Sequence, residues 1–178
     1  MFEGEKVRLR AYRREDLPLT LEYLNDLEVA EGVRPGFLFP FRKEDEDKWY
    51  DGLNPLSKDT YSFAIESLTD NSYMGGCGIK EFNVKNHTAA LGIFLGSPHW
   101  RKGYGSDALR VLVKFCFNEM NLHKIKIDVF SFNQKAMKCY EKVGFKTEGV
   151  LRQEMYRNGM YHDHIVMGLL RSEWTMDV

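Results

Sequence analysis

The sequence lacks three features that would each have indicated a class of protein. No uninterrupted apolar run approaches the roughly 18 residues of a membrane-spanning helix, which argues against a helical membrane protein. The cysteines, Cys77, Cys116 and Cys139, are odd in number and widely spaced, so they form neither a CxxC motif nor a disulfide framework. Neither sign of charge dominates, since 25 basic residues accompany 26 acidic ones. Direct binding of nucleic acid through bulk charge is therefore not expected.

Linkers, internal repeats and low-complexity tracts are also missing from the 178 residues. We therefore expect a single domain over residues 1–178, long enough to bury a substantial core. The start, MFEGEKVRLR, has no apolar signal core, so we expect a cytoplasmic protein. Because no cysteine or histidine pair has convincing metal-ligand spacing, no metal is expected.

What is present is an alternation of strand and helix patterns. Period-two patterns and turn residues predict strands, whereas apolar residues at helical spacing and capping residues predict helices. The stretch 31–41, EGVRPGFLFPF, is expected to be irregular because glycine and proline interrupt it. The predicted order is a strand (7–12), two helices (14–26 and 42–53), three strands (61–67, 73–82 and 89–96), a helix (104–120), a strand (123–130), a helix (133–145) and a final pair of strands around Asn158-Gly159. This order indicates an α+β protein whose mixed sheet is flanked by helices and ends in a hairpin.

A glycine-containing loop opens the third predicted helix, in HWRKGYGSDALR at 99–110. A helix N-terminus exposes unpaired amides and a partial positive charge, and glycine lets an anion approach them. The loop is suited to a pyrophosphate, with Arg101 and Lys102 adding charge. It is neither a Walker loop, since no Gly-Lys-Ser/Thr follows, nor a dinucleotide fingerprint, which requires a third glycine. A tight turn without a ligand is the alternative explanation.

A second group of residues lies one strand further along the chain, in NQKAMKCYEKVGF at 133–145. Asn133 is placed to cap the helix N-terminus, and Gly144 to end the helix in a left-handed conformation. Ala136 and Tyr140 are four residues apart and share one face. Taken alone, Tyr140 would be an ordinary aromatic residue of an amphipathic helix.

Together, WRKGYG at 100–105 and the N..A...Y.K.GF pattern at 133–145 resemble the GNAT superfamily of acetyl-CoA-dependent N-acetyltransferases. The order of predicted elements is similar to that fold over nearly the whole chain. The C-terminal stretch EGVLRQEMYRNGMYHDHIVMGLLRSEW, residues 148–174, resembles the branch that contains the ribosomal-protein (RimJ/RimL-type) N-terminal acetyltransferases. The resemblance implies a mostly antiparallel sheet, with a bulged strand before the coenzyme A loop and a C-terminal hairpin.

The same resemblance implies which residues bind acetyl-CoA, the co-substrate. The pyrophosphate would lie on the backbone of Arg101, Lys102, Gly103, Tyr104, Gly105 and Ser106. The pantetheine would pair with the preceding strand near Phe94 and Leu95, where Gly92 is expected to mark the opening of the sheet. Asn133 and Lys142 would border the cofactor. One departure is Trp100, which stands where relatives commonly have glutamine or arginine.

For catalysis, the resemblance implies Tyr140 as the general acid that protonates the leaving thiolate, because a phenol can donate to a thiolate of lower basicity. A backbone amide near Leu95 would stabilise the oxyanion. The general base is less defined, because Leu91 occupies the position where many relatives have glutamate. A two-residue hairpin loop predicts that Glu154 faces Asp163, a repulsive pair that could bind an amine or share a proton, so Glu154 is the first candidate. His162, His164, Glu81 and water are the others.

Three functions follow as hypotheses. The first is an N-acetyltransferase whose acceptor is a protein N-terminal amine, with a small amine (a polyamine, amino sugar or aminoglycoside) as the alternative. The second is an acyl-CoA-binding sensor without turnover, which the missing strand glutamate keeps open. The third is a nucleotide-binding protein. A homodimer is left open as the assembly.

Overall fold

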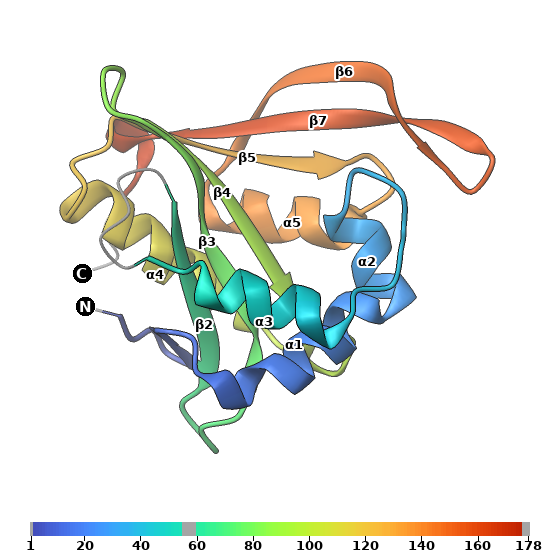
Figure 1. Cartoon of the computed structure of the whole chain (residues 1–178). Coiled ribbons are helices and arrows are strands. Elements are labelled where there is room, and N and C mark those ends of the chain that lie inside the picture. The colour runs from blue at the N-terminus through green and yellow to red at the C-terminus, as the bar shows by residue number, and fades with distance from the viewer. Residues whose placement is uncertain (1, 55–59, 176–178) are drawn as a thin grey trace.

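A seven-stranded sheet organises the chain in the computed structural model, which describes residues 2–54 and 60–175 (Figure 1). The strands are β1 (Val7–Arg10), β2 (Tyr61–Ser67), β3 (Tyr73–Asn83), β4 (Thr88–Leu95), β5 (Lys124–Phe130), β6 (Lys146–Arg157) and β7 (Met160–Leu170). The helices are α1 (Leu17–Asn25), α2 (Leu27–Val33), α3 (Lys43–Asp51), α4 (Tyr104–Asn118) and α5 (Gln134–Val143), with short 3-10 turns at Arg14–Asp16, Ser97–His99 and Arg171–Glu173.

The strands are ordered β1-β2-β3-β4-β5-β7-β6, and every neighbouring pair is antiparallel except β4 with β5. The expected mixed, mostly antiparallel sheet is therefore confirmed. None of the described helices is long and apolar enough to cross a membrane.

The parallel pair β4–β5 is short. Only Thr88–Ala90 pair with Lys124–Lys126, although β4 continues to Leu95 and β5 to Phe130. The two strands therefore separate in the middle of the sheet, and the separation is visible in Figure 1. The expected opening between these strands is present.

The bulge that accompanies this opening lies on β3, whereas we expected it at Gly92 of β4. Lys80 is the extra residue, because Ile79 pairs with Leu91 and Glu81 pairs with Ala90. Gly92 has a different use. A Cβ placed on it would lie 2.3 Å from Cε of Lys80, so glycine lets the Lys80 side chain cross β4.

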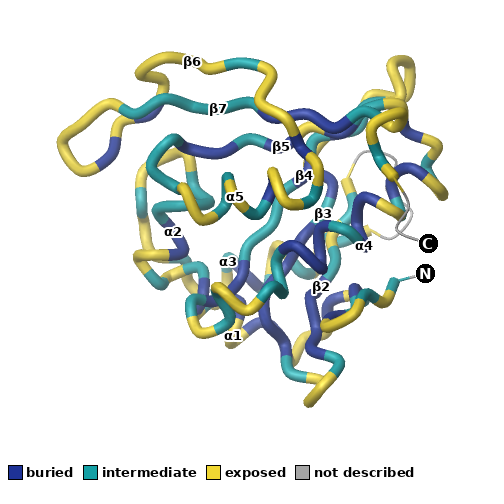
Figure 2. The backbone as a smooth tube through the Cα atoms, turned by 180° about the vertical axis from the view of Figure 1, so that it is seen from behind, coloured by how far each residue is buried: buried dark blue, intermediate teal, exposed yellow. Residues whose placement is uncertain are grey.

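Helices lie on both faces of the sheet (Figures 1 and 2). Helix α4 packs on β1, β3 and β4 and contacts α5, whereas α1 and α2 contact β3 and β4 from the opposite face. Helix α4 carries an apolar stripe, and five residues of the stripe have no exposed surface: Leu109, Leu112, Val113, Cys116 and Phe117. This stripe packs against the central strands and forms the main core.

One helix was not predicted. Residues 27–33 form α2, although part of this stretch was expected to be irregular. Asp26 caps the helix by accepting a hydrogen bond from the Glu28 amide, and Val29 and Ala30 are buried. At seven residues the helix is too short for its periodicity to be recognised in the sequence.

The C-terminal hairpin turns at Asn158 and Gly159, which both have positive φ, as an Asn-Gly turn requires. Tyr156 pairs with Tyr161 as expected. The predicted pairing of Glu154 with Asp163 is wrong, because the register shifts between Leu151 and Met155.

The N-terminal segment is tied to the start of α4 by one buried carboxylate, Asp107. Its Oδ1 accepts a hydrogen bond from the amide of Glu5 (3.1 Å), and its Oδ2 accepts from the amides of Lys6 (2.8 Å) and Val7 (3.0 Å). The carboxylate also lies in the first turn of α4, where the helix dipole favours negative charge. Asp107 therefore holds β1 and the beginning of α4 in one arrangement.

We expect Asp107→Ala to lower the free energy of unfolding by about 3 kcal/mol, because it leaves the buried amide of Val7 and the part-buried amides of Glu5 and Lys6 without an acceptor. The measurement is urea denaturation of the wild type and the variant. Glu119→Ala is the control, since Glu119 is exposed just after the same helix and its loss should change stability by less than about 0.5 kcal/mol. Equal effects of the two substitutions would contradict the role given to Asp107.

Candidate active site

The glycine loop leads into α4 through a left-handed residue. Gly103 is the residue before α4 and has φ of 85°, a left-handed conformation that glycine adopts without strain. Helix α4 then begins at Tyr104, as the sequence predicted. The amides of Tyr104, Gly105 and Ser106 belong to its first turn, which has no intrahelical partners for them. The capping residue has no side chain, and the Lys6 ammonium lies beside it, donating to the Lys102 carbonyl (2.9 Å).

The polar side chains of the loop stabilise the loop itself. The Lys102 ammonium donates to the Pro98 carbonyl (2.8 Å), and the Ser106 hydroxyl donates to the Gly103 carbonyl (3.0 Å). Arg101 has φ of 62° and an exposed side chain. Of the loop's two predicted basic side chains, Arg101 is therefore the one not already bound to the backbone.

Trp100, which departs from the usual pattern, fastens the loop to its neighbours. Its indole N–H donates to the Leu95 carbonyl at the end of β4 (2.9 Å). The Lys135 ammonium of α5 lies 4.4 Å from the centre of the Trp100 ring, a cation–π contact. Sequence reasoning missed this role, because only the fold brings Lys135 and Leu95 beside Trp100.

The opening between β4 and β5 leads from the loop toward the middle of the sheet. Phe94 and Leu95 pair on one side with Gly76 and Gly75 of β3. On their other side, no strand in the described part of the chain pairs with them. Unpaired backbone groups at this edge can hydrogen-bond an extended ligand.

Helix α5 carries the remaining predicted residues along this opening. Asn133 caps the helix as expected, accepting a hydrogen bond from the Ala136 amide (3.2 Å), and Gly144 ends it with φ of 109°. Lys142 is exposed. Burial raises the pKa of the Cys139 thiol to about 11, an effect that the charges of Arg110 and Lys142 partly oppose. Lys142 therefore lies near Cys139.

Tyr140 is 7% exposed and lines a large cavity of about 1670 Å³. No hydrogen bond to its hydroxyl is present among the described residues. Burial raises the pKa of the phenol well above its usual value, and Cys139 and Asp128 raise it further. The phenol therefore stays protonated at neutral pH and is available as a proton donor inside the cavity.

Asp128 and His164 form a hydrogen-bonded pair in the same cavity, with 2.9 Å between Oδ2 and Nε2. Asp128 lies between Ile127 and Val129, which are buried in the core beneath α4. Strand alternation therefore turns Asp128 to the opposite face of the sheet, where Val33 at the end of α2 also lines the cavity. His164 had been one of several candidate bases, and its partner Asp128 had not been singled out.

The other candidate bases do not line the cavity. Glu154 is exposed, because the bulge places three residues, 152–154, opposite Asp163 alone. The Asp163 carboxylate instead accepts a hydrogen bond from the Gln153 amide (2.9 Å), and Gln153 has φ of 56°. His162 packs edge-on against Phe132, with 4.9 Å between the ring centres. Glu81 is exposed beside the β3 bulge.

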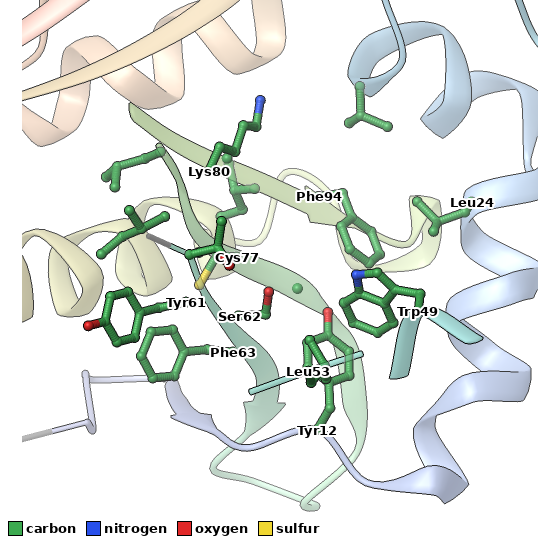
Figure 3. Close-up of a pocket in the computed structure, with 18 of the residues that line it drawn as sticks. Tyr12, Leu24, Trp49, Leu53, Tyr61, Ser62, Phe63, Cys77, Lys80 and Phe94 are labelled. Carbon is green, nitrogen blue, oxygen red and sulfur yellow. The ribbon is translucent and has the colours of Figure 1, made fainter. Parts of the chain in front are cut away.

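Aromatic residues form the part of the cavity below α1 and α3. Figure 3 shows Tyr12, Trp49 and Phe94 gathered there, with Leu24 and Leu53 beside them. The Tyr12 and Trp49 rings are in edge-to-face contact, with 4.9 Å between centres. This apolar chamber adjoins the strand opening through Phe94, so a ligand in the opening and a second ligand in the chamber would meet near that residue.

Comparison with known proteins agrees with this geometry. A family model described as an acetyltransferase (GNAT) domain matches residues 6–146. A spermidine N(1)-acetyltransferase of Vibrio cholerae is 32% identical over 171 residues, covering 96% of each chain. Bacillus subtilis YdaF, named provisionally as a ribosomal N-acetyltransferase, is 30% identical over 71% of this chain and 79% of its own.

Among solved structures, the spermidine N-acetyltransferase of Vibrio cholerae in complex with CoA and spermine superposes with a TM-score of 0.83 at 27% identity. The match covers 94% of this chain and 96% of that one. The likeness therefore extends over the sheet, the loop and the helices that border the cavity.

We expect Gly103→Ala to weaken the binding of coenzyme A about tenfold, because a side chain at φ of 85° costs roughly 1–2 kcal/mol and shifts the amides of the first turn. Gly149→Ala is the control, because Gly149 lies on β6 outside the loop. A Cβ at Gly149 would meet no atom within 4 Å, so binding should change less than twofold. Titration calorimetry measures both dissociation constants. The role of Gly103 fails if the two variants bind equally.

Proposed function

This chain belongs to the GNAT acetyltransferase family, and we propose that it acetylates a small cationic amine with acetyl-CoA as the donor. Enzymes of this family use acetyl-CoA, so the finer part of the proposal is the acceptor. The observation that carries it is the aromatic chamber beside the strand opening, which contains Tyr12 and Trp49 and is bordered by carboxylates of α3. Aromatic faces and carboxylates are the groups that recognise ammonium ions. The full-length similarity to a spermidine acetyltransferase supports the same class of acceptor.

The residues present fit acetyl-CoA. The uncapped start of α4 at Gly103 suits the pyrophosphate, and the free edge of β4 at Phe94 and Leu95 suits the amides of the pantetheine. The loop was predicted from its own residues, whereas the pantetheine edge was implied by the family resemblance. Asn133 uses its carbonyl oxygen to cap α5, so we expect it to border the cofactor mainly through this structural role.

In the proposed reaction, the neutral amine attacks the thioester carbonyl, a C–N bond forms and the C–S bond breaks. Tyr140 donates its proton to the leaving thiolate, for which its protonated state is suited. A backbone amide near Leu95 stabilises the oxyanion. The proton released by the amine goes to His164, which Asp128 orients and stabilises once it is charged. No residue becomes acetylated.

A protein N-terminal amine is the second candidate acceptor. The similarity to YdaF, whose name refers to the ribosomal N-acetyltransferases, favours it. The cavity is large enough for the first residues of a peptide, but the side chains described in the aromatic chamber are mostly rings, which suit an alkylammonium group better than a peptide backbone. The acceptor of the RimJ/RimL-type enzymes therefore stays a prediction, as do a cytoplasmic location and a homodimer.

We expect thiol release from acetyl-CoA with aliphatic di- and polyamines, and slower or no release with N-terminal peptides, amino sugars and aminoglycosides. Tyr140→Phe should lower kcat about 10²-fold while the dissociation constant of acetyl-CoA stays within twofold, because the ring remains and only the proton donor is lost. Binding of acetyl-CoA without turnover of any amine would favour the sensor hypothesis instead.

We expect Asp128→Asn and His164→Gln each to lower kcat/KM at least tenfold, because the first removes the partner that orients the base and the second removes the base. Glu154→Gln should stay within twofold, since Glu154 is exposed outside the cavity. The same assay measures all three variants. A large loss in Glu154→Gln with full activity of the other two would return the role of base to Glu154.

A further inference from the structure

A second cavity of about 260 Å³ extends the aromatic chamber between α1 and α3. Its walls include Tyr12, Leu24, Phe41, Trp49 and Phe94, together with Thr20 and two carboxylates, Asp45 and Glu46. Four of these residues, Tyr12, Leu24, Trp49 and Phe94, also line the large cavity. The two cavities are therefore neighbouring parts of one acceptor region.

Glu46 is buried without a partner. It is 6% exposed, and its carboxylate has no hydrogen bond or ion pair with any residue that the structure describes. Its neighbours on α3 differ, because Asp45 pairs with Arg42 (3.0 Å) and Asp47 with Arg14 (3.5 Å). Burial raises the pKa of Glu46, and the negative charge of Asp45 raises it further.

An unpaired carboxylate in an apolar site is unfavourable for folding, since burial removes its hydration without replacing it. Such a group becomes favourable when a cation enters the site and pairs with it. The surrounding rings of Tyr12 and Trp49 would add cation–π attraction to such a pair. The lining is thus complementary to an alkylammonium group.

We propose that Glu46 binds a second, non-reacting ammonium group of the acceptor, so that the enzyme selects amines that carry at least two amino groups on an aliphatic chain. This inference rests on the proposed function. The reacting amine must be near Tyr140 and His164, which line the large cavity and not the second one. Glu46 lies in the second cavity alone, so it contacts a different nitrogen from the one that is acetylated.

The test compares a diamine, 1,5-diaminopentane, with its monoamine analogue, pentylamine, under identical conditions. We expect the wild type to prefer the diamine, and Glu46→Gln to lower the ratio of the two kcat/KM values at least tenfold. Glu44→Gln is the matched control, because Glu44 is exposed on the same helix and its loss should leave the ratio within twofold. Thermal unfolding checks that both variants are folded, and Glu46→Gln should unfold at the same or a higher temperature at pH 7.

Each outcome of this comparison either supports or overturns the role proposed for Glu46. A ratio that falls only in Glu46→Gln supports the inference. A ratio unchanged in Glu46→Gln, with small amines still acetylated, overturns the inference and leaves the proposed function standing. If the wild type acetylates peptides but neither amine, the proposed function fails and this inference fails with it.

Discussion

Three residue pairs join β4 to β5, and the early end of this parallel ladder is the constraint on which the site depends. Beyond Ala90 the two strands separate inside a sheet that is continuous on both sides, so the opening has rigid walls. Backbone groups that a neighbouring strand would have paired are left to a ligand. The glycine loop lies at the far end of β4, and Trp100 ties it to that strand through the Leu95 carbonyl. The position of the glycine loop relative to the opening is therefore set by the backbone of β4.

How far the sequence predicts this arrangement depends on whether the signal is local. The start of α4 at Gly103, the caps of α5 at Asn133 and Gly144, and the turn at Asn158 could be predicted because each depends on a few adjacent residues. The strand opening was predicted only through family resemblance. The accompanying bulge was predicted on the wrong strand. Glycine often marks a bulge, which pointed to Gly92 of β4, whereas the residue type of Lys80 on β3 gives no sign of one.

The candidate catalytic base could not be predicted from the sequence, because its position depends on residues far apart in the chain. A regular hairpin would pair Glu154 with Asp163. The structure has a three-residue bulge there, so the two residues are not paired. Gln153 accommodates that bulge with a positive φ, a conformation that nothing in its residue type predicts. The Asp128–His164 pair joins residues 36 positions apart across β5 and β7. Only the register of those two strands brings the side chains together, and the register was not available from the sequence.

Two buried carboxylates, Asp107 and Glu46, differ in whether the protein itself supplies their hydrogen-bond partners. Asp107 is 5% exposed and accepts three backbone hydrogen bonds, so its charge is fully used within the protein and stabilises the native state. Glu46 is similarly buried at 6% exposed, yet its carboxylate has no hydrogen bond or ion pair with any residue that the structure describes, and burial raises its pKa. A group whose pKa is higher in the folded state than in the unfolded state destabilises the fold as pH rises through the folded value. Ionisation of Glu46 in the empty site therefore costs stability, and that cost is consistent with a site that is completed only when a cationic acceptor binds.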